Sequence, residues 1–219
     1  MTDRTDSPAD AALLDSGRRT FAAEAAALAA VGERLDAAFG HAARAMFDCH
    51  GSVLVTGLGK SGLVARKVAA TLTATGTPSV FIHPVEATHG DLGIVRRGDV
   101  LIAISRSGNN REVNNLVAPC RHFGLTVVAI TGAVAGELAQ LSDIVLACPV
   151  EREACPLNLT PTSSATAAAV MGDALALALL ELRGFTAQDF AVFHPSGVLG
   201  RSLLLRVREL MHTGDQLPT

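Results

Sequence analysis

Residues 52–62 read SVLVTGLGKSG, and this stretch decides the fold class. Ser52–Thr56 is a short run rich in β-branched residues that predicts a buried strand; Gly57 ends it, and a helical pattern follows from Ser61 to Thr75. Four further segments have the character of buried strands, and they are Ser79–His83, Val100–Ser105, Leu125–Thr131 and Ile144–Cys148. Strands that are apolar on both faces and alternate with helices are typical of a parallel sheet covered on both sides. We therefore expect an α/β fold with a doubly wound parallel sheet of about five strands.

Helical spacing of Ala and Leu also precedes the first strand. Ala9–Asp48 has this pattern, with a break near Val31–Gly32, so two N-terminal helices are predicted. Later helices are expected over about 110–123 and 162–183. The apolar run 165–182 approaches the length of a bilayer span, but Asp173 and Glu181 interrupt it, and we interpret it as a buried helix.

The composition is that of a globular domain. The chain has 219 residues, of which 49% are hydrophobic and 18% charged, with a formal net charge of -3. This length is enough for one large domain with a full core. The weak negative charge favours neither a nucleic acid nor a membrane as partner, so an anionic substrate would have to be held by local groups.

The cysteines and the N-terminus bear on the cellular compartment. Cys49, Cys120, Cys148 and Cys155 form no CxxC pair, so neither a structural zinc site nor a redox motif is predicted. Scattered thiols, together with a polar N-terminus that has no apolar signal core, predict a cytoplasmic protein.

A glycine-rich loop follows the first predicted strand. Gly57–Gly62 ends at a helix start, where free N–H groups and a partial positive charge favour an anion. Gly59 lets the backbone approach a ligand, Lys60 adds a full charge and Ser61 a hydroxyl. The spacing is neither that of a Walker A motif nor GxGxxG, and a simple tight turn is the alternative.

A polar loop follows the strand predicted at 100–105. Ser105-Arg106-Ser107-Gly108-Asn109-Asn110 combines hydroxyls, a glycine and a helix start, which together make an anion cradle. Helix capping could explain one serine but not the whole set.

Three other loops carry polar groups. Glu86–Asp91 offers acid/base groups or metal ligands, and Glu151–Pro156 leads to Pro161–Ser164 at the start of a long helix. Capping explains the Thr and Ser of that helix start under either interpretation. His194–Gly197 precedes a predicted short terminal helix; a lone histidine is more often structural than catalytic, although this one does not lie on an apolar face.

These segments together resemble the SIS (sugar isomerase) domain family. In their order along the chain and in their residues they are closest to its arabinose 5-phosphate isomerase branch. The matching stretches are GLGKSG, GTPSVFIHPVEATHGDLG, AISRSG, EREACPLNLTPTSSATAAAVMGDALALALLELRGF and HPSGVLGR. The resemblance implies a disordered tail at 1–8, an isomerase domain at 9–211 and a C-terminal tail at 212–219. Many members of the branch continue with a pair of CBS domains, and this sequence ends about where that pair would begin.

The resemblance also implies an activity and a set of site residues. Members of the branch interconvert D-ribulose 5-phosphate and D-arabinose 5-phosphate, whose product feeds synthesis of Kdo for lipopolysaccharide. The family's catalytic set falls on Lys60, Glu112, Glu153 and His194. The substrate- and phosphate-binding set comprises Gly59, Ser61, His89, Ser105, Ser107, Asn110, Thr162, Ser163 and Ser164. No cofactor and no metal are expected, and the resemblance implies a homo-oligomer, a tetramer, in which the residue at His194 reaches a neighbour's site.

The chain departs from the family pattern in one place. The family reads SGE followed by Ser or Thr, whereas this chain has Asn109 and Asn110 after Ser107-Gly108. The Asn110 amide can donate hydrogen bonds to a phosphate, so the site can survive.

A metal-free isomerisation through a cis-enediol needs a carbon base, a group that stabilises the developing oxyanion, and a grip on the phosphate. We take Glu153 as the first choice for the base and Glu112 as the second, with a pKa raised by burial as the favourable case. Lys60 would stabilise the oxyanion, and His194 would open the cyclic sugar or move protons between oxygens. Two alternatives stay open: an isomerase for another sugar phosphate, and a non-catalytic sugar-phosphate sensor.

Overall fold

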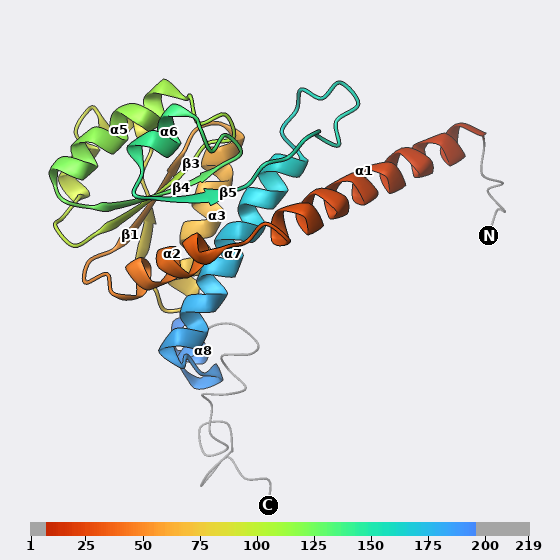
Figure 1. Ribbon diagram of the computed structural model, residues 1–219. Helices are drawn as coiled ribbons and strands as arrows, with labels where there is room; N and C mark the ends of the chain where they lie inside the picture. Colours follow the sequence, from red (N-terminus) through yellow and green to blue (C-terminus); the bar gives the residue numbers. More distant parts are fainter. Residues whose placement is uncertain (1–7, 196–219) are drawn as a thin grey trace, which may run out of the picture.

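The computed structural model describes residues 8–195, and its centre is a five-stranded, entirely parallel sheet (Figure 1). The strands lie in the order β2-β1-β3-β4-β5. Their bounds are β1 Val53–Gly57, β2 Ser79–Phe81, β3 Val100–Ile104, β4 Thr126–Thr131 and β5 Ile144–Ala147. All five strands predicted from the sequence are present, and the expected doubly wound fold is confirmed.

Helices cover both faces of the sheet. One face carries α1 Pro8–Gly32, α2 Ala37–Phe47, α3 Lys60–Ala74 and α7 Ser163–Arg183; the other carries α4 Pro84–Ala87, α5 Arg111–His122 and α6 Glu137–Leu141. The 3₁₀ helix η1 Asp91–Ile94 follows α4, and α8 Ala187–Phe193 follows α7. Four short helices, α4, η1, α6 and α8, were not predicted from the sequence, and each is seven residues or shorter.

Successive side chains of each strand point to opposite faces of the sheet, so the core has two layers. Val55 and Ile102 face α3 and α7, whereas Leu54 and Leu101 face α5. The four side chains are 0–1% exposed, because neighbouring strands pair in register and present matched rows to each face. Both faces are therefore apolar, which is why the strands read as continuous hydrophobic runs.

The long helix α7 is the apolar segment singled out from the sequence. Among the described residues it is the one helix long and apolar enough to cross a membrane, with a mean hydropathy of 1.6. It lies against α3, α1 and α2, and its buried residues belong to the main core. Asp173, which interrupts the apolar run, forms an ion pair with Lys67 of α3. This packing is that of the core helix predicted for the segment.

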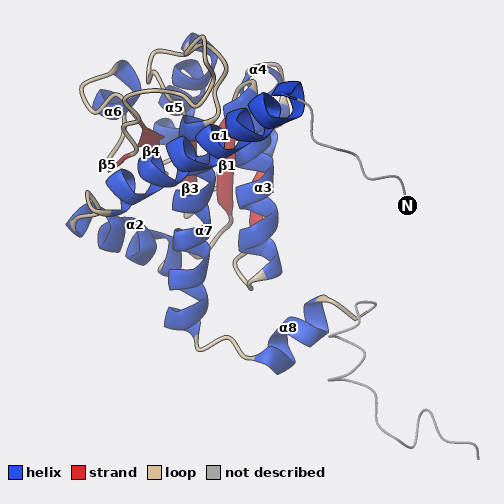
Figure 2. Cartoon of the chain, turned by 90° about the vertical axis from the view of Figure 1, so that its right-hand side faces the viewer, coloured by secondary structure: helices blue, strands red, loops and turns tan. Residues whose placement is uncertain are grey.

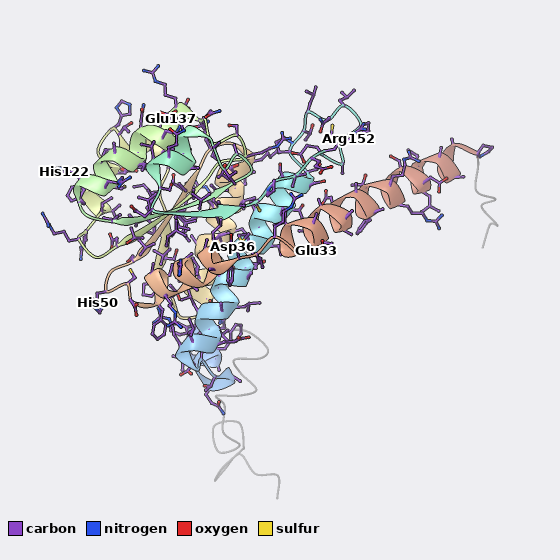
Figure 3. The ribbon with its side chains drawn as sticks, in the orientation of Figure 1. Glu33, Asp36, His50, His122, Glu137 and Arg152 are labelled. Atoms are coloured by element: carbon purple, nitrogen blue, oxygen red, sulfur yellow. The ribbon has the colours of Figure 1, made fainter. Side chains whose placement is uncertain are left out.

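Helix α1 extends away from the rest of the domain (Figure 1). Its single buried residue is Val31, and Glu24 ties it to α7 by accepting a hydrogen bond from Thr166 Oγ1 at 2.8 Å. The predicted break between the two N-terminal helices is confirmed, since Asp36, labelled in Figure 3, caps α2 by accepting from Ala38 N at 2.9 Å. Because α1 begins at Pro8, the predicted tail loses one residue; residues 1–7, and the predictions for 196–219, lie outside the described part.

Candidate active site

The candidate site lies at the carboxyl ends of β1 and β3. The chain moves from β1 to β2 on one side and places β3 on the other, so the order reverses between β1 and β3. In open parallel sheets ligands bind at such a reversal, beyond the carboxyl ends of the strands. The loop that begins at Gly57 and the loop that begins at Ser105 leave the sheet there.

A cleft lies next to these loops, beyond the ends of β3 and β4 and between the first turns of α3 and α7. Its polar and charged lining residues are Lys60, Ser61, Arg106, Thr131 and Ser164, which come from four different segments. The remaining lining residues are Val64, Ile104, Ile130, Gly132, Cys148, Pro161, Ala165 and Ala168. The cleft thus has an apolar floor made of strand ends and helix sides, and a rim of cations and hydroxyls.

The glycine-rich loop places Lys60 and Ser61 in the first turn of α3. Gly59 is the residue before the helix and has φ 59°, in the left-handed region that glycine adopts without steric cost. No side chain caps this helix start, so its first N–H groups have no side-chain partner. Together with the exposed Lys60, they form a positive rim suited to an anion.

The two predicted serines shape their own turn. Ser105 is 5% exposed and its Oγ accepts from Gly108 N at 3.2 Å, while the exposed Ser107 Oγ accepts from Asn109 N at 3.3 Å. Asn110 caps α5, because its Oδ1 accepts from Val113 N at 3.1 Å. This bond uses the carboxamide oxygen of Asn110 and leaves its NH₂ group available to donate.

Residues 105–110, called the serine loop below, are hydrogen-bonded to residues of α5 and α6. Asn114 Nδ2 donates to Gly108 O at 3.2 Å and to Glu137 Oε2 at 2.8 Å. Glu137, labelled in Figure 3, donates its backbone N–H to Asn109 Oδ1 at 3.2 Å. The departure from the family pattern at Asn109 therefore has a structural role, since this side chain joins the loop to the start of α6.

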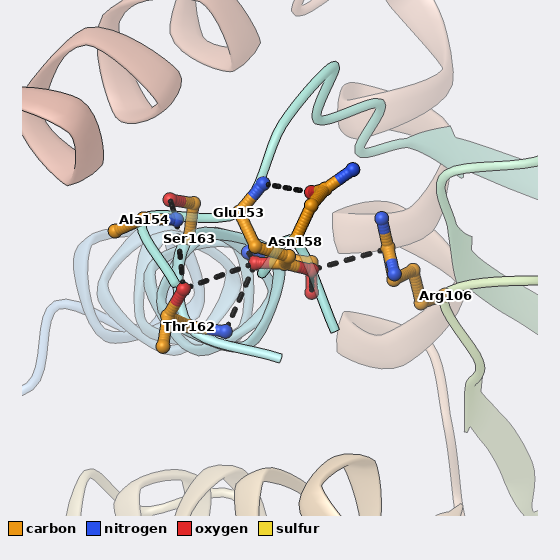
Figure 4. A network of polar contacts seen from close by, with 7 residues as sticks. Arg106, Glu153, Ala154, Asn158, Thr162 and Ser163 are labelled. Atoms are coloured by element: carbon orange, nitrogen blue, oxygen red, sulfur yellow. Dashed lines mark hydrogen bonds and ion pairs between the residues drawn. The ribbon is translucent and has the colours of Figure 1, made fainter. Parts of the chain in front are cut away.

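Glu153 is the most constrained side chain near the cleft (Figure 4). It is 2% exposed and lies at the start of α7. Its Oε2 accepts from Thr162 N at 2.9 Å and from Ser164 N at 3.0 Å, and its Oε1 accepts from Ser164 Oγ at 2.5 Å. Arg106 Nε lies 3.2 Å from Oε1. The carboxylate is thus hydrogen-bonded to the N-terminus of α7 on one side and ion-paired with Arg106 on the other.

These contacts set the charge of Glu153. Burial raises its pKa, but the hydrogen bonds from the Ser164 side chain, Ser164 N and Thr162 N, together with the charge of Arg106, lower the pKa further than burial raises it. Net, the pKa of Glu153 lies below its usual value. The favourable case of a pKa raised by burial is therefore not met at this residue, because the helix start supplies donors that favour the charged form.

The other polar residues of this helix start bind the preceding loop. Thr162 Oγ1 and Ser163 Oγ accept from Ala154 N at 2.9 and 3.2 Å. Asn158, which has a positive φ of 54°, accepts from Glu153 N at 2.8 Å (Figure 4). The expectation that Thr or Ser caps this helix start was wrong, because the Thr162 side chain makes no cap bond to α7. Glu153 accepts from the N–H groups there, and Thr162 and Ser163 bind the preceding loop instead.

Of the predicted site residues, Lys60, Ser61 and Ser164 line the cleft and the other ten do not. Three of those ten lie on other elements. Glu112 is exposed in the first turn of α5, and His89 is exposed between α4 and η1. His194 follows α8, where its ring stacks on Phe190 at 3.9 Å between centroids and its Nδ1 lies 2.9 Å from Phe190 O. Figure 2 shows α8 at the far end of α7 from the strand ends, so one copy of the chain does not bring His194 to Lys60.

Arg106 is the charged residue of the cleft lining that was not predicted from the sequence. The signal was a cation between two serines in a loop already predicted to bind an anion, but its partner Glu153 lies in a distant segment. Within residues 8–195, no three His, Cys, Asp or Glu side chains come together in a way that could hold a metal ion. The absence of a metal requirement stays a prediction.

The chain belongs to the SIS domain family, which it matches over residues 46–178. Its curated relatives include arabinose 5-phosphate isomerase KdsD of Escherichia coli K12, 51% identical over 203 residues, which are 93% of this chain and 62% of the relative. KdsD of Pseudomonas aeruginosa is 47% identical over 205 residues, 94% of this chain and 63% of that protein. The chain thus spans less than two thirds of the length of these relatives.

One solved structure is similar to this chain in both fold and sequence. The structure of Escherichia coli CFT073 c3406 in complex with arabinose 5-phosphate superposes with a TM-score of 0.81 at 38% identity, covering 89% of this chain and 100% of that one. The expected SIS fold is confirmed.

Proposed function

We propose that this chain is an aldose–ketose isomerase that interconverts D-ribulose 5-phosphate and D-arabinose 5-phosphate. The observation that carries the proposal is the cleft beyond the ends of β3 and β4, where Lys60 and Arg106 face hydroxyl groups over an apolar floor. The relatives named arabinose 5-phosphate isomerase and the neighbour that binds arabinose 5-phosphate supply the substrate class. The product would supply Kdo synthesis in the cytoplasm.

The proposed reaction runs through a cis-enediol. The phosphate is held by the serine loop and the open start of α3, so that binding energy at a non-reacting group positions C1 and C2. Lys60 lies at the rim of the same cleft and stabilises the oxyanion that develops when a proton leaves carbon.

Glu153 remains the first candidate for the carbon base and Glu112 the second. A lowered pKa keeps Glu153 ionised near neutral pH, so it can accept a proton, although less readily than a carboxylate with a raised pKa. To reach a carbon atom it must give up one of the hydrogen bonds that it accepts, and the bond from Ser164 Oγ comes from a residue that lines the cleft. Glu112 is free of such bonds but would need the substrate to extend toward α5.

His194 completes the proposed site from a neighbouring copy of the chain. It is placed away from Lys60 within one chain, and α1 has exposed apolar side chains, including Leu13 at 71% and Phe21 at 83%, that a partner could cover. The proposed assembly is a homotetramer with shared sites, and it binds neither nucleic acid nor membrane.

The deciding experiment is an assay of ribulose 5-phosphate conversion. We expect D-arabinose 5-phosphate as product, with activity retained after treatment with a chelator. Turnover of a different pentulose, hexulose or heptulose phosphate in its place would favour the other isomerases of the family. Tight binding of D-arabinose 5-phosphate with no conversion would favour a sensor and refute the enzymatic proposal.

A further inference from the structure

Arg106 is held at the cleft wall by both its backbone and its side chain. Its carbonyl oxygen accepts from Gly132 N at 3.1 Å, which ties the residue to the end of β4. Its Nε lies 3.2 Å from Glu153 Oε1, and the Glu153 side chain is fully buried. The Arg106 side chain is nevertheless 44% exposed and lines the cleft (Figure 4). One end of the guanidinium is fixed while the rest borders open space.

The contact with Glu153 is an ion pair at Nε, and an arginine side chain has five N–H donors. Within residues 8–195, the two terminal nitrogens of Arg106 make no hydrogen bond to the protein. A guanidinium oriented through Nε presents the remaining donors as a fork, the geometry that matches a carboxylate or a phosphate bidentately.

Stability alone does not account for this arrangement. Glu153 already accepts from Thr162 N, Ser164 N and Ser164 Oγ without Arg106. An ion pair with a half-exposed arginine contributes little to stability, because solvent screens it and the side chain loses entropy. The pair is better explained as a device in which a buried carboxylate orients a cation toward the cleft.

The charges around the cleft define the ligand. Lys60 and Arg106 are the charged residues in its lining, and both are cations. Building on the function proposed above, we infer that Arg106 binds the substrate phosphate through its terminal guanidinium nitrogens and that Glu153 acts on this contact as a positioning residue. The phosphate then lies between the serine loop and the wall formed by Arg106.

The test is direct binding to the full chain, measured by calorimetry with D-arabinose 5-phosphate and, separately, with inorganic phosphate. Arg106→Gln should weaken the binding of both by roughly ten-fold or more, the loss expected when a hydrogen bond to a charged group is removed. Arg106→Lys keeps the charge without the fork and should give a smaller loss. The matched control is Arg121→Gln: Arg121 is similarly exposed at 47% and pairs with Asp143 away from the cleft, so its variant should bind as the wild type does.

The thermal midpoint of each variant separates binding from folding. A dissociation constant for Arg106→Gln within two-fold of wild type, in a folded protein, would overturn the inference, as would a wild-type chain that binds neither ligand. The proposed function fails separately: a wild type that binds both ligands but converts no sugar phosphate would refute the isomerase and leave the role of Arg106 supported by the loss in its variant.

Discussion

At the scale of single residues, Lys60 is the side chain on which the proposed chemistry depends most. It lies in the first turn of α3 at the cleft rim and contributes nothing to the packed core. Lys60→Ala should lower turnover about 10²–10³-fold, the usual effect of losing one oxyanion-stabilising group, with the fold intact. Lys67→Ala removes a lysine from the same helix outside the cleft and should leave turnover near wild type. Steady-state kinetics of the two folded variants would contradict this role if they gave equal turnover.

The serines of the 105–110 loop could have two roles, binding the phosphate and holding the turn, and the two roles predict different results. If Ser105 and Ser107 bind phosphate, the variant Ser105→Ala/Ser107→Ala should raise KM and lower kcat, because each lost hydrogen bond to a charged group is worth roughly 1.5–3 kcal/mol. Both hydroxyls also accept from backbone N–H groups of the turn, so some loss of stability is expected in addition. The thermal midpoint and kcat/KM should be measured on the same protein. A lowered midpoint with unchanged kcat/KM would show that the serines only hold the turn.

The lowered pKa of Glu153 makes a prediction about stability and pH. A carboxyl whose pKa is lower in the folded than in the unfolded chain stabilises the fold above its unfolded pKa of roughly 4.3, and the contribution is lost as the pH falls through the folded pKa. Glu153→Gln should therefore lower the free energy of unfolding at pH 7, by roughly 1.5–3 kcal/mol for the lost charge-assisted bonds, and by progressively less in acid. Urea unfolding at pH 7, 5, 4 and 3 measures the difference. A difference that stays constant over this range would contradict the assignment.

At the scale of elements, the contact between α3 and α7 sets the shape of the layer that carries Lys60 and Ser164. Gly172 allows this close approach, because a Cβ added there would lie 2.2 Å from Val68 Cγ2. Gly172→Val should lower the free energy of unfolding by about 1–3 kcal/mol through overpacking. In α1, nothing lies within 4 Å of a Cβ added at Gly17, so Gly17→Val is the control and should be near neutral. Equal thermal midpoints for the two variants would be inconsistent with this packing.

The short elements explain a different property of the site, its rigidity. Helix α6 has five residues, yet the N–H groups of Glu137 and Leu138 bond to the serine loop at Asn109 Oδ1 and Gly108 O. Asn114 closes the same network from α5. The loop is thus shaped before a ligand binds, which lowers the entropic cost of binding.

At the scale of the whole molecule, the distance between Lys60 and His194 within one chain is a consequence of where α8 lies. If sites are shared between copies, a mixture of Lys60→Ala and His194→Ala chains should regain activity after subunit exchange. Random mixing of two-chain units would restore about a quarter of the sites, because each mixed pair has one site with both residues. Light scattering should show an oligomer. A fully active monomer, or no recovery after verified exchange, would contradict the shared site.

Local patterns in the sequence were sufficient to predict the sheet and the loops at its carboxyl edge in which polar groups collect. Val53–Gly57 and Val100–Ile104 are buried on both faces and end in polar, glycine-containing loops, so the strand-to-helix order and the carboxyl-end location follow from the pattern alone. The break between α1 and α2, and the buried character of α7, also follow from residues near each other in the chain. Helices as short as α6 have too few turns to produce a recognisable period.

What the sequence by itself determined is therefore the fold class, the family resemblance and the loops in which polar groups collect. Only the tertiary structure decided how those groups interact: that Glu153 accepts hydrogen bonds from the start of α7 and forms an ion pair with Arg106, that its pKa falls although it is buried, and that His194 lies away from Lys60. The reason is physical. A residue's identity fixes which bonds it can make, but its burial, its partners and its pKa depend on segments that are distant in sequence and meet only when the sheet and its helices have assembled.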